Sequence, residues 1–339
     1  ALKEAIRGQE ENLGIFICGG KGKTSRRTPD EIMSWGQRLS LPEEKTSRLV
    51  YNSRMAAKVD SALVQDGFQI YHHSFFFSYR KPPILSKKSI TNKQEIPKTE
   101  PAPTPNFGVG AWTVVQQGMN AENQTARRYH WFSENIRDLV VEPHSGVVSD
   151  AKGVVLNLVA KKSAKTRQLS TELIQGGYKT LMKDIELLRK HSGSVSQMLS
   201  LKFQGEKYTF LELANREFKT HPLISEDFSR SKYLEKILSQ ATDRQPQNYE
   251  ELLATPGVGP KTMRALALVG EVIYGAEPSY EDPARYSFAH GGKDATPYPV
   301  DRKTYDYTID TMQRLVAKTK ISLFEKKKIE KRLLIEHPF

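Results

Sequence analysis

The sequence contains a single cysteine, Cys18, among its 339 residues. One cysteine excludes internal disulfides, a zinc ribbon and an iron–sulfur cluster held by cysteines. The sequence also lacks any run close to the ~20 apolar residues that a membrane-spanning helix needs, and it shows no signal peptide. We therefore expect a cytoplasmic protein with no membrane partner and no iron–sulfur cluster.

Two motifs that would identify a bound cofactor are missing as well. No H-E-x-x-H or C-x-x-C spacing is present, so no metal site can be recognised from a motif. The run from Gly19 to Thr24, GGKGKT, follows a predicted strand but lacks the spacing of a P-loop. We interpret it as a flexible basic loop whose Lys21 and Lys23 contact phosphate. A solvated turn is the main alternative, and a nucleotide site is the least favoured one.

Positive charge is what the sequence has in excess. The chain carries 51 Lys and Arg against 39 Asp and Glu, a formal net charge of +12. A chain this basic usually binds a polyanion, because each neutralised phosphate releases counterions. We therefore expect a nucleic acid partner, DNA rather than RNA, with a generally basic, solvated surface as the alternative. The sequence is compatible with a homo-oligomer and does not determine the oligomeric state.

The spacing of apolar residues predicts an α+β fold in two parts. A mixed α/β domain with a small sheet is predicted for residues 1–165, and an all-α domain for residues 166–339. The strands are predicted near 13–18, 68–77 and 111–117. Helices are predicted from Thr28, as the cap before a Pro, and over 47–65, 169–191, 208–218, 233–241, 249–253, 263–274, 301–317 and 323–335.

The segment 80–108 differs in composition from its surroundings. It is rich in Pro, Lys and Thr, and its apolar residues follow no period. Such a composition predicts an exposed, mobile excursion from the core. The strands at 68–77 and 111–117 would then be antiparallel neighbours joined by this segment.

Polar side chains are concentrated at the strands and strand ends of the first half. Adjacent histidines on a strand point to opposite sides, so only one of His72 and His73 can enter a given site. The candidate catalytic residues are His72, His73, Gln117, His130 and His144. The candidate phosphate contacts here are Arg127 and Arg128. The candidate ligands of a divalent metal, Mg²⁺ or Mn²⁺, are Asp60, Asp66 and Glu142. The alternative for each single histidine is a packing or capping role.

The stretch TPGVGPKT, from Thr255 to Thr262, predicts a tight turn between two helices at about 249–274. Gly257 and Gly259 permit positive φ and close backbone approach. The second helix begins near a proline, so its free amides favour a backbone phosphate, beside which Lys261 and Thr262 lie. The pattern predicts a helix-hairpin-helix that holds nucleic acid by its phosphates.

This hairpin, followed by PYPVDRKTYD, resembles the helix-hairpin-helix and aspartate arrangement of the DNA glycosylase superfamily. The resemblance implies that Lys261 forms a Schiff base with the sugar and that Asp301 assists it. Two features depart from the superfamily. The interval between these residues is long because 277–298 is inserted, and the cysteines of the superfamily's iron–sulfur members are absent.

Most of the chain outside 80–108 resembles a narrower group, the domain-of-unknown-function family 763. The resemblance is carried by GGKGKTSRRTPDEI, AAKVDSALVQDGFQIYHHSFFF, WTVVQQGMN, ARRYHW, EPHSGVV and HGGKDATPYPVDRKTYD. It implies an α/β region followed by a helix-hairpin-helix region, and a role in DNA or RNA processing.

Three functions compete on this sequence. The first is a nuclease whose active site lies in the α/β region and whose helical half holds the phosphates. The second is a DNA glycosylase and AP lyase that uses Lys261 and Asp301. The third is a non-catalytic DNA-binding module. The concentration of polar residues in the α/β region favours the nuclease, because a glycosylase does not need it.

Overall fold

A computed structural model describes the fold as a mixed α/β arrangement built around an antiparallel sheet. The described residues are 2–80, 108–121, 125–149, 152–191, 201–203, 206–208, 232–284, 302–318, 322–324 and 326–327. The predicted excursion at 80–108 and the predicted helix at 208–218 lie almost entirely outside these ranges. Asp301 lies outside them as well.

The central sheet has five strands in the order β1-β3-β4-β5-β6, and every neighbouring pair is antiparallel. The strands are β1 Ile15–Lys21, β3 Gln69–Arg80, β4 Gly108–Met119, β5 Ala126–Phe132 and β6 Gly146–Ser149. The predicted pairing of 68–77 with 111–117 is confirmed, because β3 and β4 run side by side. The predicted basic loop is wrong in part, since Gly19 to Lys21 continue β1.

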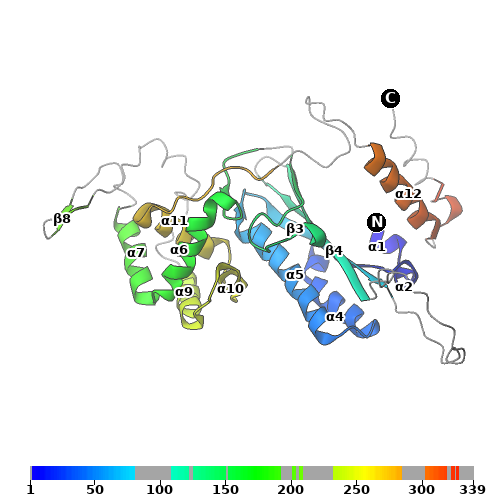
Figure 1. The fold of residues 1–339 in the computed structure, drawn as a ribbon, viewed down its shortest axis with the longest axis horizontal. Helices are drawn as coiled ribbons and strands as arrows, with labels where there is room; N and C mark the ends of the chain where they lie inside the picture. Colours follow the sequence, from blue (N-terminus) through cyan, green and yellow to red (C-terminus); the bar gives the residue numbers. More distant parts are fainter. Residues whose placement is uncertain are drawn as a thin grey trace, which may run out of the picture.

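The helices over 28–38 and 43–62 lie along one face of this sheet (Figure 1). The N-terminal helices are α1 Leu2–Ala5, α2 Glu10–Leu13, α3 Lys23–Arg26, α4 Thr28–Arg38 and α5 Glu43–Ala62. The predicted start of α4 is correct, but Thr28 does not cap it. The Thr28 hydroxyl donates to the carbonyl of Ser25 at 2.7 Å, and the carboxylate of Glu31 accepts from the amide of Gly19 at 2.7 Å. These bonds fix α3 and α4 to the end of β1.

The second half of the chain adds a further group of helices. They are α6 Ala164–Gln175, α7 Tyr178–His191, α9 Lys232–Arg244, α10 Tyr249–Ala254, α11 Pro260–Tyr274 and α12 Arg302–Lys318. The prediction of one helix over 169–191 is wrong, because the chain turns between α6 and α7, where Gly177 has a φ of 97°.

Short strands also occur outside the central sheet. The pair β8 Leu201–Phe203 and β9 Glu206–Tyr208 is antiparallel and lies in the predicted helical domain. The prediction that this half is all-α is therefore wrong. A second short pair joins β2 Val64–Gln65 to β7 Leu156–Asn157. The division into domains at residue 165 stays a prediction.

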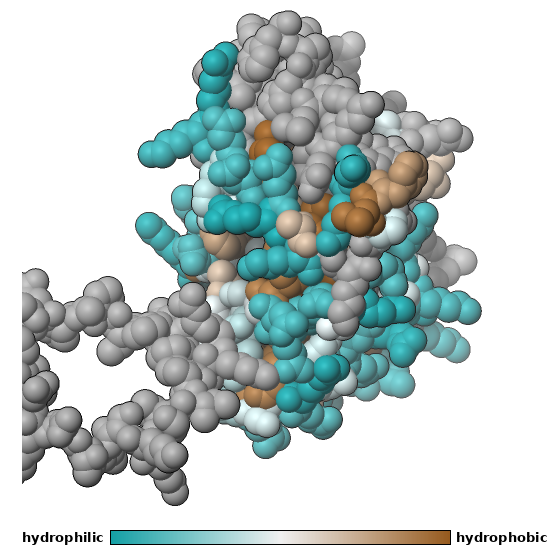
Figure 2. All heavy atoms as spheres, turned by 90° about the vertical axis from the view of Figure 1, so that its right-hand side faces the viewer, coloured by the Kyte–Doolittle hydropathy of each residue, from teal (hydrophilic) through white to brown (hydrophobic). Residues whose placement is uncertain are grey.

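The surface that faces the viewer in Figure 2 is mainly hydrophilic, and small hydrophobic areas lie between the polar side chains. Within the described ranges, no helix has the length and apolar character that crossing a membrane requires.

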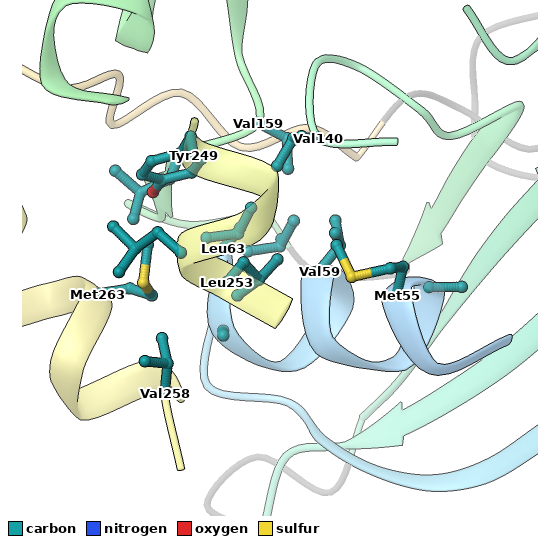
Figure 3. Packing of buried hydrophobic residues seen from close by; sticks show 14 of the residues in the cluster. Met55, Val59, Leu63, Val140, Val159, Tyr249, Leu253, Val258 and Met263 are labelled. Carbon is teal, nitrogen blue, oxygen red and sulfur yellow. The ribbon is translucent and has the colours of Figure 1, made fainter. Parts of the chain in front are cut away.

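Helix α5 contacts the sheet on one side and the helical group on another. Met55 and Val59 lie in the second half of this helix, Leu63 directly follows it, and all three belong to the hydrophobic core (Figure 3). Leu253 of α10 and Met263 of α11 belong to the same cluster of buried residues. Burying such side chains contributes roughly 1.5–3 kcal/mol each, so this packing joins the two halves of the chain.

Polar contacts also fix α10 and α11 against α5. Lys58 donates to the carbonyl of Leu253 at 2.5 Å and to that of Thr255 at 2.8 Å, at the end of α10. The carbonyl of Thr255 also accepts from the amide of Val258 at 3.2 Å, whereas that of Leu253 lies in the last turn of α10, where carbonyls lose their intrahelical partners, so the ammonium satisfies it. Burial lowers the pKa of Lys58. The side chain of Gln65 donates to the carbonyl of Pro260 at 3.0 Å, at the start of α11.

Replacing Lys58 by alanine should lower the free energy of unfolding by about 1–3 kcal/mol, because part-buried carbonyls lose their donor. Lys45 lies on the same helix and is exposed, so Lys45→Ala should stay within about 0.5 kcal/mol of the native protein. Urea unfolding followed by circular dichroism measures both variants. Equal effects of the two substitutions would show that the Lys58 contacts do not hold α10 to α5.

Candidate functional site

The strand register divides the polar residues of the sheet between its two faces. Residues that pair across antiparallel strands point to the same side, and neighbours along a strand point to opposite sides. His73 pairs with Gln116, and Gln116 pairs with Tyr129, on the side that α5 covers. We call this side the helix-covered face. The other side, which we call the open face, carries a row formed by Lys21, His72, Gln117 and Arg128.

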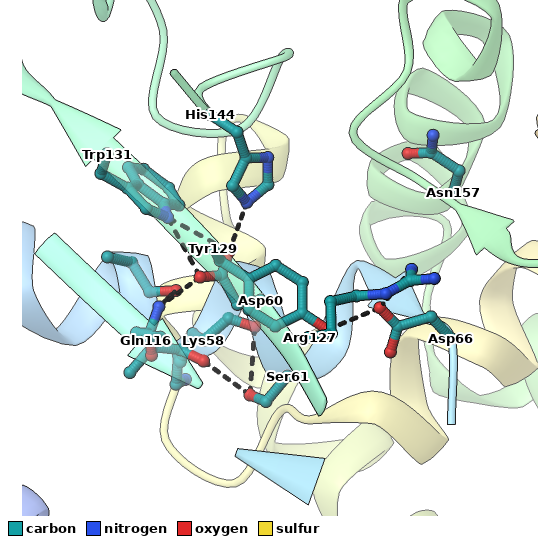
Figure 4. A network of polar contacts seen from close by, with 12 residues as sticks. Lys58, Asp60, Ser61, Asp66, Gln116, Arg127, Tyr129, Trp131, His144 and Asn157 are labelled. Carbon is teal, nitrogen blue, oxygen red and sulfur yellow. Dashed lines mark hydrogen bonds and ion pairs between the residues drawn. The ribbon is translucent and has the colours of Figure 1, made fainter. Parts of the chain in front are cut away.

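The centre of the helix-covered face is Asp60, a fully buried carboxylate in the last turn of α5. His144 places Nε2 2.5 Å from its Oδ1, and the indole of Trp131 donates to its Oδ2 at 3.0 Å. The side-chain amide of Gln116 also donates to Oδ2. Figure 4 shows these side chains converging on the carboxylate. Asp60 thus ties α5 to two strands and to the segment before β6.

His73 belongs to the same network. Its Nδ1 lies 3.0 Å from the side-chain oxygen of Gln116, and its Nε2 lies 2.9 Å from the hydroxyl of Ser53. The Gln116 amide nitrogen already donates to Asp60, so the Gln116 oxygen must accept from a protonated Nδ1 of His73. Burial lowers the pKa of His73, which agrees with this neutral form. Both nitrogens of this ring are engaged in packing the sheet against α5.

Arg127 lies at the end of this face with only 1% of its side chain exposed. It makes ion pairs with Asp66 at 2.9 Å and with Asp282 at 2.8 Å. The hydroxyl of Tyr129 donates to Asp66 at 2.5 Å. Burial raises the pKa of Asp66, although the neighbouring guanidinium opposes this change. Arg127 is therefore enclosed by protein, which contradicts its predicted contact with nucleic acid.

The predicted metal ligands do not gather at one place. Asp60 and Asp66 accept hydrogen bonds inside the helix-covered face, whereas Glu142 pairs with Lys161 at 3.1 Å on the surface. Among the described residues, no group of three or more His, Cys, Asp or Glu side chains could hold a metal ion. The described part of the chain therefore does not join these candidates into a site.

The open face presents a different set of polar side chains. The row formed by Lys21, His72, Gln117 and Arg128 crosses strands β1, β3, β4 and β5. Lys21 and Arg128 are exposed, and Lys21 Nζ lies 5.6 Å from the ring centre of Tyr71. In the described ranges, the side chains of Gln117 and Arg128 form no hydrogen bond or ion pair. Their donors are available to a ligand.

Two histidines stand on the open face. The Nε2 of His72 lies 2.9 Å from the hydroxyl of Ser74, and burial lowers the pKa of His72 below its usual value of 6.5. The charge of Lys21 acts in the same direction. His130 lies two positions from Arg128 along β5, and burial also lowers its pKa. Its Nε2 is buried and has no hydrogen-bond partner within the described residues. Burial thus favours the neutral form of both imidazoles.

The predicted hairpin is present as α10, a tight turn and α11. Gly257 has a φ of 84°, and a Cβ there would lie 2.2 Å from Cδ1 of Ile237, so the turn requires glycine. Gly259 caps α11, and Lys261 is exposed in its first turn. Thr262 is only 3% exposed, which contradicts its predicted contact with phosphate. The amides of the first turn and Lys261 remain the candidate phosphate contacts, which stays a prediction.

A family model described as "Protein of unknown function (DUF763)" matches residues 1–89 and 108–300. The chain belongs to this family. No curated protein and no solved structure gives a significant match. Membership of this family names no activity, so the resemblance of the hairpin region to DNA glycosylases stays a prediction.

The structure of this family member separates the predicted site residues in a way that the sequence only partly indicated. His72, Gln117, His130 and Arg128 share the open face, whereas His73, His144 and Arg127 serve the helix-covered face. The sequence ARRYHW could have predicted this division within β5, because successive side chains of a strand point to opposite faces of the sheet. Asp282 was missed, since nothing near it in the sequence indicates a partner 155 positions away.

The adjacent residues Arg127 and Arg128 should respond oppositely to substitution. Arg127→Met should cost about 3–5 kcal/mol of unfolding free energy, because Asp66 and Asp282 would remain buried without a counter-charge. Arg128→Met should change it by about 0.5 kcal/mol or less, since that side chain is exposed. Chemical denaturation of both variants gives the comparison. Similar losses in the two variants would refute the division of the faces.

Proposed function

We propose that this protein binds nucleic acid and cleaves its phosphodiester backbone on the open face of the sheet. The observation that carries the proposal is the contrast between the two faces. The polar groups of the helix-covered face bond to one another, whereas the donors of Gln117 and Arg128 have no partner in the described ranges. A net charge of +12 favours a polyanion as the ligand.

The row on the open face has side chains suited to a phosphodiester. Lys21 and Arg128 stand at its two ends and supply positive charge for phosphate oxygens. Gln117 lies next to Arg128 and can donate to the same group. Charge that develops on the phosphoryl oxygens during cleavage would be stabilised by these fixed donors. We assign substrate binding and charge stabilisation to Lys21 and Arg128, and charge stabilisation alone to Gln117.

His72 lies between Lys21 and Gln117 and is our candidate general base. When its Nε2–H donates to Ser74, the other ring nitrogen carries the lone pair and can accept a proton. A water that loses its proton to this nitrogen attacks the phosphorus, the bond to the leaving oxygen breaks, and that oxygen takes a proton from solvent. Burial lowers the pKa of His72 and so favours the unprotonated form of this nitrogen that a general base needs.

The hairpin supports the same proposal as a second phosphate contact. Lys261 is exposed beside the first-turn amides of α11, a position that suits a backbone phosphate. A lysine that forms a Schiff base is activated by desolvation or by a neighbouring cation, and an exposed ammonium lacks the first of these. We therefore assign Lys261 to binding, and the lyase reaction becomes one outcome of the assay.

The assay uses labelled single-stranded, duplex, bubble and abasic DNA, together with RNA, in the presence of Mg²⁺, Mn²⁺ or EDTA. Cleavage of undamaged strands supports the nuclease. A borohydride-trapped complex on abasic DNA that disappears in Lys261→Ala would establish the lyase instead. If the protein binds these substrates but neither cleaves nor traps any of them, the non-catalytic DNA-binding module is the correct function.

His72→Ala and Gln117→Ala should reduce cleavage by about 100-fold or more, because general-base and charge-stabilising groups contribute on this scale. Binding should change little, since neither side chain carries a permanent positive charge. Lys183→Ala is the control, because Lys183 is exposed on α7 outside the sheet. Gel assays give the cleavage rates, and fluorescence anisotropy gives the affinities. Full cleavage by both variants would contradict the proposed site.

A further inference from the structure

The open face carries aromatic side chains as well as polar ones. Phe76 of β3 and Phe132 of β5 both pair with Thr113 of β4, so the two rings flank one position in a single cross-strand row. Both phenylalanines are half-buried. Their neighbours Phe75 and Trp131 point to the helix-covered face and are fully buried. Packing in the core therefore explains Phe75 and Trp131. It does not explain the two outward rings, which are only half-buried.

The aromatic row lies at a regular distance from the polar row. Phe76 lies four positions after His72 on β3, and Phe132 lies four positions after Arg128 on β5. At about 3.3 Å per residue, the two rows lie roughly 13 Å apart. Neighbouring strands are about 4.8 Å apart, so the two phenylalanines are about 10 Å from each other across β4. Both rows thus fit within a span of several nucleotides.

The three outward rows contain no acidic side chain. They include Lys21, His72, Gln117 and Arg128 in the polar row, Ser74, Val115 and His130 in the middle row, and Phe76, Thr113 and Phe132 in the aromatic row. The remaining members are Ile17, Gly19, Gly146 and Val148 on the outer strands, and Ile17 and Ser74 are buried. A phosphate backbone lying along these rows would meet cations and neutral donors and would not be repelled. The surface therefore combines positive charge with half-buried rings, and charge and rings are the features by which sheets bind unpaired nucleotides.

We propose that the open face binds single-stranded nucleic acid, with bases stacked on Phe76 and Phe132 and phosphates held at Lys21 and Arg128. The inference rests on the proposed function and specifies its substrate class. In a duplex the bases are stacked on each other and cannot reach a ring on a flat sheet, so a single strand gains contacts that a duplex does not. The polar row then acts on the backbone of the strand that the rings hold.

The test measures the affinity of His72→Ala protein, in which cleavage is suppressed, for labelled single-stranded DNA, single-stranded RNA and duplex DNA of one sequence. Single strands should bind more tightly than the duplex. Adding Phe132→Ala or Phe76→Ala should weaken single-strand binding by about 5- to 100-fold, the range of one lost base stack. Duplex binding should change less than twofold. Comparison of the DNA and RNA arms identifies the natural strand.

Two controls make the result specific. Phe132→Tyr keeps a ring and should retain the affinity, which separates stacking from a general loss of structure. Phe324 is 77% exposed outside the sheet, so Phe324→Ala should have no effect. Equal affinity for single strand and duplex, or unchanged binding in both sheet variants, would overturn the inference. If the native protein binds single strands through these rings but cleaves none, the proposed function fails and the inference stands.

Discussion

The buried carboxylate of Asp60 imposes the strongest constraint on this structure. A charge without partners in an apolar interior costs several kcal/mol, so the fold must bring hydrogen-bond donors to it. They come from β4, β5 and the segment before β6, as Gln116, Trp131 and His144. One side chain of α5 thereby sets the position of the sheet beneath the helix. The opposite side of α5 holds the helical hairpin through Lys58.

This arrangement decides which polar residues are available for chemistry. Residues on the helix-covered face, such as His73 and Arg127, use their donors and acceptors within the protein. Residues one position away, such as His72 and Arg128, point to the open face. A ligand that displaced the first set would have to break a buried network, whereas a ligand on the open face gains contacts at little cost to stability. The proposed function follows from this difference between side chains that bond to other parts of the protein and side chains that point to the open face.

Local sequence patterns predicted much of the fold. They could not predict which residues far apart in the sequence pair with each other. The apolar runs predicted β1, β3 and β4, and the glycines of TPGVGPKT predicted the turn between α10 and α11. The site was predicted less well. Arg127 and His144 have the residue types of a nucleic-acid or catalytic site, but their partners Asp282 and Asp60 lie 155 and 84 positions away. A pattern in a short window cannot indicate such partners, and burial is what decides their role.

The central claim is that nucleic acid lies on the open face of the sheet. Ultraviolet cross-linking of the native protein to a single-stranded oligonucleotide, with the attachment sites mapped to single residues by mass spectrometry, tests it most directly. The account predicts cross-links at outward residues such as Phe76, Phe132 and His72, with a second group near Lys261 at the hairpin. Cross-links confined to parts of the chain outside the sheet and the hairpin would contradict it.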